Sequence, residues 1–363
     1  MFTRDLLTNP AIRGVTDLKH EVVAAASSTS AARAGEFLTK VKAPSTAKAH
    51  GSYTELVQDP NVNIVYVATP HSHHFQNAML CLQAGKHVLC EKALTVNAAQ
   101  AKKLCQVAKE KNLFFMEAVW TRFFPLSIAI RDMIRAGKIG PVHRVAADNT
   151  LNTTFDNTHR MVNMDLAGGA LLDLGIYSLT WVFQILYHLQ QTRPREAPQV
   201  LAAIHKYGPT GCDEETSMIL KFAIQKTMGV ALTGMRGGVA KVPTTAPQVV
   251  ISGTKGAIQV EGPIFRPTFF RIQWQNGEVE EHSYPIPTDP ERDNWGHGMF
   301  WEADEVARCI RDGKLESPRL GWEESIVIME TMDEVRRQGD LAYPELIETA
   351  EFDPESPLNT GAR

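Results

Sequence analysis

The sequence has few cysteines and no pair of them spaced for zinc or redox chemistry. Five cysteines are scattered among 363 residues, without any Cys-x-x-Cys pair, so buried free thiols are expected. Lysine and arginine form no basic stripe and the net charge is −4, which argues against nucleic acid as a partner. No apolar run approaches the roughly 20 residues that a membrane-spanning helix needs. We therefore expect a cytoplasmic protein with neither nucleic acid nor membrane as a partner.

Length and hydrophobic pattern predict two domains. A chain of 363 residues is too long for one ordinary core. Up to residue 121, short apolar runs alternate with helical patterns, which is typical of parallel strands joined by crossover helices. Strand-like segments then follow one another, which favours a largely antiparallel sheet. We expect an α/β Rossmann-type domain over residues 1–121, an α+β domain with an open sheet over 122–345, and an extended tail over 346–363.

The expected elements can be placed by residue number. In the first domain, strands are expected at 22–26, 64–68, 87–90 and 113–117, and helices at 31–41, 71–84 and 98–111. In the second domain, strands include 143–148, 218–222, 249–251 and 258–260, and helices are 127–136, 174–189 and 301–311. The tail beyond Tyr343 shows no periodicity and contains three prolines, so we expect it to run as an extended surface segment.

The first domain lacks the opening that such a sheet normally has. A dinucleotide-binding sheet begins with a strand, a glycine-rich turn and a helix whose amides hold the pyrophosphate. Here residues 1–7 already read as that helix, and no Gly-x-Gly-x-x-Gly precedes residue 22. Either the recorded start lies inside a longer protein, which we favour, or the chain is complete and binds its nucleotide poorly or not at all. We expect the chain as given to bind weakly.

Two segments at strand ends carry candidate site residues. Ala68-Thr69-Pro70-His71-Ser72-His73-His74 joins a strand to a helix, where ligands approach the sheet. The three histidines lack a carboxylate or cysteine at ligand spacing, so helix capping or cofactor contact is favoured over a metal site. In Cys90-Glu91-Lys92-Ala93, a charged pair ends a strand, where it needs a ligand or a partner. Solvated surface positions are the plain alternative for both segments.

A third segment is Gly168-Gly169-Ala170-Leu171-Leu172-Asp173-Leu174-Gly175-Ile176-Tyr177. Asp173 and Tyr177 are four residues apart, which places both side chains on one helix face next to a glycine turn. The alternative is an aspartate that caps the helix and a tyrosine packed in the core.

Together these motifs resemble the Gfo/Idh/MocA oxidoreductase family over nearly the whole chain. The family's Glu-Lys-Pro, Thr-Pro-Asn-x-x-His and Gly-Gly-x-x-x-Asp-x-Gly motifs correspond to segments 91–93, 69–74 and 168–175. Ala93 and His71 depart from the usual proline and asparagine, and Tyr177 stands where many members carry histidine. Tyr177, together with segment 116–125, looks like the branch of dimeric dihydrodiol dehydrogenases and fungal D-xylose dehydrogenases, and segment 356–361 is similar to the fungal xylose enzymes specifically.

The resemblance implies an NADP-dependent oxidation of an aldose at its anomeric hydroxyl, with D-xylose as the first candidate. The catalytic residues would be Lys92, Asp173 and Tyr177. Tyr177 would be the base, its phenolate favoured by Lys92, which would hydrogen-bond the same oxygen. Asp173 would orient Lys92 or a substrate hydroxyl, and Trp120 and Phe124 would form an apolar wall against the sugar.

Cofactor choice depends on the end of the strand at 22–26. NAD enzymes place an acidic residue there for the ribose, whereas this chain has Ser27, Ser28 and, nearby, Arg33, which favours NADP. The full set of expected cofactor-binding residues is Ser27, Ser28, Arg33, Thr69, Pro70, His71, His74, Glu91, Lys92, Trp120 and Arg122. No metal is expected.

Two other substrates and a non-catalytic role are alternatives to D-xylose oxidation. The substrate could be a trans-dihydrodiol or another aldose, and the missing glycine turn leaves room for a non-catalytic sensor. Retention of Lys92, Asp173 and Tyr177 opposes the sensor, because it has no need of a cation beside a phenol. A homodimer is expected because an antiparallel sheet can leave one apolar face to be covered by a second copy.

Overall fold

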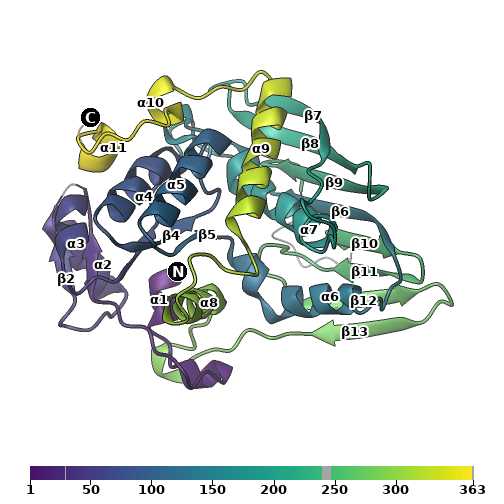
Figure 1. The fold of residues 1–363 in the computed structure, drawn as a ribbon, viewed down its shortest axis with the longest axis horizontal. Coiled ribbons are helices and arrows are strands. Elements are labelled where there is room, and N and C mark those ends of the chain that lie inside the picture. Colours follow the sequence, from purple (N-terminus) through teal and green to yellow (C-terminus); the bar gives the residue numbers. More distant parts are fainter. Residues whose placement is uncertain (29, 239–246, 362–363) are drawn as a thin grey trace.

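The protein is described by a computed structural model over residues 1–28, 30–238 and 247–361 (Figure 1). Its first part holds two parallel sheets, one of β1 (Ala24–Ala26) and β2 (Lys48–His50), the other of β3 (Ile64–Val67), β4 (His87–Glu91) and β5 (Phe115–Ala118). No strand among the described residues joins the two sheets. The expected Rossmann-type arrangement of parallel strands is confirmed.

Helices precede and connect these strands. They are α1 (Phe2–Leu6), α2 (Ala31–Lys40), α3 (Tyr53–Gln58), α4 (His74–Gln83) and α5 (Ala98–Glu110), with 3-10 turns η1 (Pro10–Arg13) and η2 (His71–His73). Ser30, Ser52 and Asn97 each accept a hydrogen bond from a backbone amide of the first turn, which stabilises the helix start. The sequence did not predict β2 or α3, because β2 is mostly exposed and carries no apolar pattern.

The second part is built on one eight-stranded sheet in the order β13-β12-β11-β10-β6-β9-β8-β7, in which only β6 and β9 pair in parallel. The strands are β6 (Val142–Thr150), β7 (Gln199–Lys206), β8 (Asp213–Phe222), β9 (Thr227–Gly234), β10 (Val249–Gly253), β11 (Gly256–Val260), β12 (Phe269–Trp274) and β13 (Val279–Ser283). Burial alternates along β8, with every second residue exposed. One face of the sheet is thus buried, and the mostly antiparallel α+β domain is confirmed.

Four longer helices belong to this part (Figure 1). They are α6 (Pro125–Arg135), α7 (Ile176–Leu186), α8 (Phe300–Arg311) and α9 (Trp322–Gln338), with short turns η3 (Trp120–Phe123), η4 (Met164–Leu166), η5 (Leu171–Gly175) and η6 (Pro290–Arg292). α7 and α9 pack on the buried face, α7 on β6 and β9 and α9 on β7 and also on α5, while α8 lies beside α1 of the first part. The sequence did not predict α9, the helix between the two sheets.

The helical run from Met164 to Leu186 corrects the expectation that no apolar run is long enough to span a membrane. It is long and apolar enough to cross a membrane by composition, but 94% of its most apolar window is buried inside the protein. All eleven residues of α7 are buried. Surface on all sides of α7 is therefore covered by protein, as in a core helix.

The C-terminal segment is not simply extended, as the sequence suggested. It contains two short helices, α10 (Glu345–Glu348) and α11 (Pro357–Thr360). Ser356 caps α11 by accepting a hydrogen bond from the amide of Leu358, and Gly361 ends it with a left-handed φ of 71°. A single turn is too short to give a periodic pattern, which explains why the sequence did not reveal it.

Candidate functional site

Lys92 and Asp173 meet where the two parts of the chain join. Lys92 follows β4 directly, and its Nζ donates to Asp173 Oδ1 at 2.7 Å and to the Asp173 backbone oxygen at 2.6 Å. Asp173 lies in η5, one turn of π-helix, and Arg160 approaches its other carboxylate oxygen at 3.3 Å. The structure thus brings together Lys92 and Asp173 as the sequence predicted, and adds Arg160.

Tyr177 completes this group but not in the expected way. The Lys92 ammonium lies 4.9 Å from the centre of the Tyr177 ring, and the hydroxyl of Tyr177 accepts a hydrogen bond from Trp120 Nε1 at 2.8 Å. The expected hydrogen bond between Lys92 and the phenol oxygen is therefore wrong for this structure, because Asp173 holds the ammonium. Trp120 supplies the polar contact to the hydroxyl instead.

Electrostatics follow from burial and from these contacts. Burial opposes the charge on Lys92, yet Asp173, Tyr177 and Glu91 outweigh it and raise the Lys92 pKa. Burial also opposes the charge on Asp173, but Lys92 and the neighbouring cations hold its pKa well below the usual range. For Tyr177, burial dominates over the nearby ammonium and raises the pKa to about 12. A lowered phenol pKa was expected, and that direction is wrong here because desolvation exceeds the attraction of Lys92.

The backbone around Lys92 is held by a buried carboxylate that the sequence reading did not assign. Glu117, in β5, accepts hydrogen bonds from the amide of Leu94 at 2.9 Å and from Ser325 Oγ at 2.8 Å. Burial raises the pKa of Glu117 to about 7. Glu91 Oε2 accepts from the amide of Lys92, and Tyr66 donates to Glu91 Oε1. These contacts fix the path of the chain that carries the lysine.

Two of the histidines lie beside the group and are buried. His71 Nε2 is 4.0 Å from Asp173 Oδ1, and burial lowers the pKa of His71 to about 3. His74 faces the backbone oxygens of Ala93 and Thr69, each at 2.9 Å, and burial lowers its pKa to about 4. Within the described ranges, no group of three or more His, Cys, Asp or Glu is placed to hold a metal ion. His74 therefore links the segment after β3 to the segment after β4.

Aromatic side chains line one side of Tyr177. Trp120 stacks on His297 with ring centres 5.0 Å apart, and Phe265 lies 5.6 Å from Tyr177 between ring centres. His297 and Phe265 come from segments far along the chain, and no sequence pattern pointed to either. Phe124, expected to form a wall against the sugar, is 1% exposed and packs against Trp120 and Trp301. It supports the Trp120 ring.

Arg122 does not join the group. Its guanidinium is fully buried, donates to the backbone oxygen of Arg319 at 2.7 Å, and pairs with Glu324 at 2.8 Å. Glu324 also contacts His188 at 2.9 Å. The expectation that Arg122 binds cofactor is wrong, because this ion cluster ties η3 to α9.

Ser27, Ser28 and Arg33 form a separate cluster at the end of β1. The amide of Ser27 donates to the His50 backbone oxygen at 3.3 Å, and Ser30 Oγ accepts from the amide of Arg33 to cap α2. The Arg33 side chain is exposed. A helix N-terminus, two serine residues and an arginine thus stand at one strand end, which is a suitable arrangement for an anion.

The helix that carries Asp173 and Tyr177 begins at a turn where only glycine fits. Gly169 has a φ of 136°, and a Cβ there would lie 1.9 Å from Asp213 Oδ1. The other carboxylate oxygen of Asp213, from β8, accepts from the amide of Leu171 at 2.5 Å. Burial raises the pKa of Asp213 to about 7. This contact anchors the start of η5 to the sheet.

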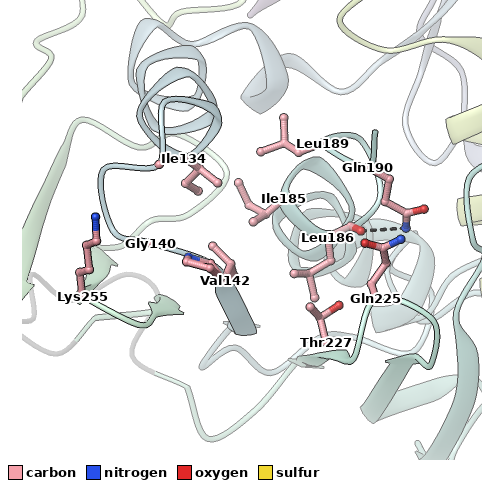
Figure 2. A pocket seen from close by; sticks show the side chains of 12 residues that line it. Ile134, Gly140, Val142, Ile185, Leu186, Leu189, Gln190, Gln225, Thr227 and Lys255 are labelled. Atoms are coloured by element: carbon pink, nitrogen blue, oxygen red, sulfur yellow. Dashed lines mark hydrogen bonds between the residues drawn. The ribbon is translucent and has the colours of Figure 1, made fainter. Parts of the chain in front are cut away.

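A surface hollow lies away from this group, at the other end of α7 (Figure 2). It has a volume of about 410 Å³. Its lining comes from the ends of α6 and α7 and from the β10–β11 turn, including Ile134, Leu189, Gln190 and Lys255. It contains none of the residues that the sequence assigned to a site.

Comparison with known proteins agrees with this architecture. Residues 8–119 match the model of an oxidoreductase family with an NAD-binding Rossmann fold, and residues 128–259 match the GFO/IDH/MocA C-terminal domain. The chain is 59% identical over 368 residues to D-xylose 1-dehydrogenase (NADP(+)) of Hypocrea jecorina, covering 99% of this chain and 94% of that protein. It is 36% identical to trans-1,2-dihydrobenzene-1,2-diol dehydrogenase of Macaca fascicularis, covering 90% and 91%.

Solved structures share the fold. A 3-ketoreductase from Actinomadura kijaniata, in complex with NADP, superimposes with a TM-score of 0.70 at 24% identity, covering 93% of this chain and 94% of that one. Aldose-aldose oxidoreductase from Caulobacter crescentus gives 0.74 at 21% identity, with 92% and 93% covered. With both domain models matched and a relative 59% identical along nearly its whole length, the chain belongs to the Gfo/Idh/MocA oxidoreductase family.

Proposed function

We propose that this protein is an NADP-dependent oxidoreductase that oxidises the anomeric hydroxyl of an aldose, D-xylose first of all, to the 1,5-lactone. The observation that carries the chemistry is the buried group of Lys92, Asp173 and Tyr177 at the junction of the two domains. The 59% identity to a D-xylose 1-dehydrogenase (NADP(+)) supports the choice of sugar and cofactor.

NADP fits the side chains present at both strand ends. Thr69 Oγ1, after β3, is buried and has no hydrogen-bond partner among the described residues, so it is available to a ligand there. At the end of β1, no acidic side chain follows the strand, and Ser27, Ser28 and Arg33 would hold a 2′-phosphate. The segments after β3 and β4, with His71 and Lys92, would face the nicotinamide half. Bound NADP supplies the acceptor for the hydride.

The protein's own groups would then accept the proton that the substrate loses. As the C1–H bond breaks with its electron pair leaving as hydride, the C1 hydroxyl must lose its proton while its oxygen becomes the lactone carbonyl. Tyr177 Oη is proposed to take that proton, because Trp120 already donates to this oxygen and the Lys92 ammonium lies beside the ring. Asp173 holds Lys92 in place and keeps it charged.

The assay that tests this function uses the full chain with D-xylose and NADP. Reduction of NADP should accompany formation of the lactone, which NMR of the sugar identifies. D-xylose with NAD, and trans-1,2-dihydrobenzene-1,2-diol with NADP, serve as the comparison reactions, since the 36% identical relative carries the latter name. A preference for the diol would move the protein to the second substrate class, and no turnover of either would contradict the proposal.

We also propose that the protein is a homodimer through the uncovered face of its large sheet. Leu201 on β7 is 66% exposed and pairs across the ladder with Ile219 on β8, which is 41% exposed. Ile219 in turn lies opposite Val230 on β9. An apolar row across three strands is commonly buried by a second copy.

A further inference from the structure

The C-terminal segment reaches back across the first domain and is held there by side-chain amides. Gln100, on α5, donates to the backbone oxygens of Ile347 and Thr349 at 2.9 and 2.8 Å. Gln76, on α4, exchanges two hydrogen bonds with the segment: its Nε2 donates to the Glu351 oxygen at 2.8 Å, and its Oε1 accepts from the Asp353 amide at 3.1 Å. The segment therefore follows one path over α5 and then α4 (Figure 1).

The end of the segment is fixed most firmly at Asn77. Its Nδ2 donates to the Leu358 backbone oxygen at 2.9 Å and to Asn359 Oδ1 at 3.0 Å. Asn77, Leu358 and Asn359 are 5%, 7% and 4% exposed, so both hydrogen bonds are shielded from water. Asn359 also donates to the Asp353 oxygen at 2.9 Å, which closes the segment on itself.

Beyond this anchor, the segment touches both strand ends where the dinucleotide is expected. α11 lies against α4 and against η2, the turn that follows Thr69 and Pro70 after β3. Gly361 lies against Ser28 after β1, so closely that a Cβ at Gly361 would be 2.8 Å from Ser28 Cβ and Oγ. Because β1 and β3 belong to separate sheets among the described residues, the segment is a bridge between their carboxyl ends.

We propose that residues 345–361 are part of the dinucleotide site: they hold Ser28 against α4 and thereby set the affinity for the 2′-phosphate of NADP. This inference rests on the proposed NADP-dependent function. Residues of the segment are positioning residues, since they act through Ser27, Ser28 and Arg33. The carboxyl edge of such a sheet is where the dinucleotide lies, and a loose phosphate-binding turn must be ordered at a cost when ligand binds.

The first test uses Asn77→Ala, which removes both shielded hydrogen bonds without changing any residue assigned to the cofactor. The dissociation constants of NADP and NAD are measured by calorimetry on the full chain. We expect the NADP constant to rise about tenfold or more, as loss of one charge-assisted contact would do, and the NAD constant to change much less. Gln106→Ala is the matched control, because Gln106 is an exposed amide on α5 that bonds only Glu110 in the described structure.

A second variant pair addresses Ser28 directly. Gly361→Ala and Gly313→Ala place a Cβ on left-handed glycines with φ of 71° and 66°, but only Gly361 has a neighbour within 4 Å, namely Ser28. Gly361→Ala should weaken NADP more than NAD, and Gly313→Ala should weaken neither. For Asn77→Ala and Gly361→Ala, the KM for NADP should rise while kcat with D-xylose stays within about twofold, because the reacting groups are untouched.

Hydrogen exchange gives a readout that does not depend on activity. In the wild type, NADP should slow exchange of residues 351–361 more than NAD does, since binding and ordering are linked. Asn77→Ala should speed it in the free protein. The inference is overturned if residues 351–361 of Asn77→Ala exchange at the wild-type rate. It is also overturned if Asn77→Ala and Gly361→Ala lose NADP and NAD affinity equally. A wild type that binds neither dinucleotide would overturn the proposed function as well, which separates the two failures.

Discussion

Lys92 contacts Asp173 twice, donating from one ammonium to its carboxylate at 2.7 Å and to its backbone oxygen at 2.6 Å. The second contact ties the lysine to the turn of π-helix that starts the Tyr177 helix, and the first keeps the lysine charged. Position and charge of the ammonium are thus both set by one residue of the other domain. Catalysis by this group would require the two domains to keep the relative position that joins Lys92 to Asp173.

Replacing Lys92 by methionine should lower kcat for sugar oxidation by about 10²–10⁴-fold, as for loss of a group that assists proton transfer. It removes the cation beside Tyr177 and leaves Asp173 with Arg160 and His71. Steady-state kinetics with D-xylose and NADP measure the effect. Lys102→Met is the control, because Lys102 pairs with Glu330 on the surface, where an ion pair contributes little. Near-normal turnover in Lys92→Met would exclude the lysine from the reaction.

Tyr177→Phe removes only the hydroxyl that accepts from Trp120. If that oxygen takes the substrate proton, kcat should fall by about 10²–10⁴-fold while sugar binding changes far less. The double variant with Lys92→Met should be little worse than either single variant, since both residues serve one proton. Tyr207→Phe, which loses an exposed hydrogen bond to Asn157, is the control. Full activity of Tyr177→Phe would make Asp173 and His74 the next candidates for the base.

Oxidation should speed up as pH rises. Because burial raises the pKa of Tyr177 to about 12, the phenol is protonated at neutral pH, and its phenolate fraction grows about tenfold per pH unit below that value. The rate of D-xylose oxidation, measured from about pH 6 to about pH 9, should therefore climb steadily if this tyrosine is the base. Lys92→Met should move the rise to higher pH, because the Lys92 charge lowers the Tyr177 pKa more than the hydrogen bond from Trp120 does. A flat profile would contradict a tyrosine base.

Local patterns predicted most of the fold and the Lys92–Asp173–Tyr177 group, but not most of the contacts between residues far apart in the sequence. Apolar runs fixed β3 and β4, and motif spacing put Asp173 and Tyr177 on one helix face. The hydrogen bond from Trp120 to Tyr177, the stacking of His297 on Trp120 and the anchoring of Leu171 by Asp213 join residues 57, 177 and 42 positions apart. Such pairs depend on how the sheets and helices pack, which periodicity does not encode.

Arg122 was assigned to the wrong place for the same reason, because its contacts join distant parts of the chain. Arg122 was expected to bind the cofactor, yet the structure buries it completely against Glu324 on α9. Its partner Glu324 could not be predicted, because no helix was expected over the residues that form α9. Whether a charged residue binds a ligand or forms a buried ion pair can be predicted only when the element that packs against it is known.

The homodimer proposal predicts that Ile219→Lys yields a monomer. Ile219 lies between Leu201 and Val230 in the ladder of the uncovered sheet face, and a lysine there would place a charge at the centre of an apolar interface. Light scattering at several protein concentrations measures the mass. Ile224→Lys is the control, because Ile224 is 77% exposed in the turn between β8 and β9. A wild type that is already monomeric would contradict the dimer.

Gly169→Ala should damage the site through the backbone rather than through any reacting group. A Cβ there would lie 1.9 Å from Asp213 Oδ1, and the φ of 136° is one that side chains rarely adopt. The turn must shift, which pulls Leu171 from Asp213 and displaces Asp173 and Tyr177, so both stability and kcat should fall, the former by about 1–3 kcal/mol or more. Gly85→Ala, at a φ of 77° with nothing within 4 Å, isolates the backbone cost alone, about 1–2 kcal/mol. Urea midpoints and kcat are measured for both variants. If Gly85→Ala lowers the midpoint as much as Gly169→Ala and Gly169→Ala keeps its kcat, the close contact with Asp213 does not position the helix.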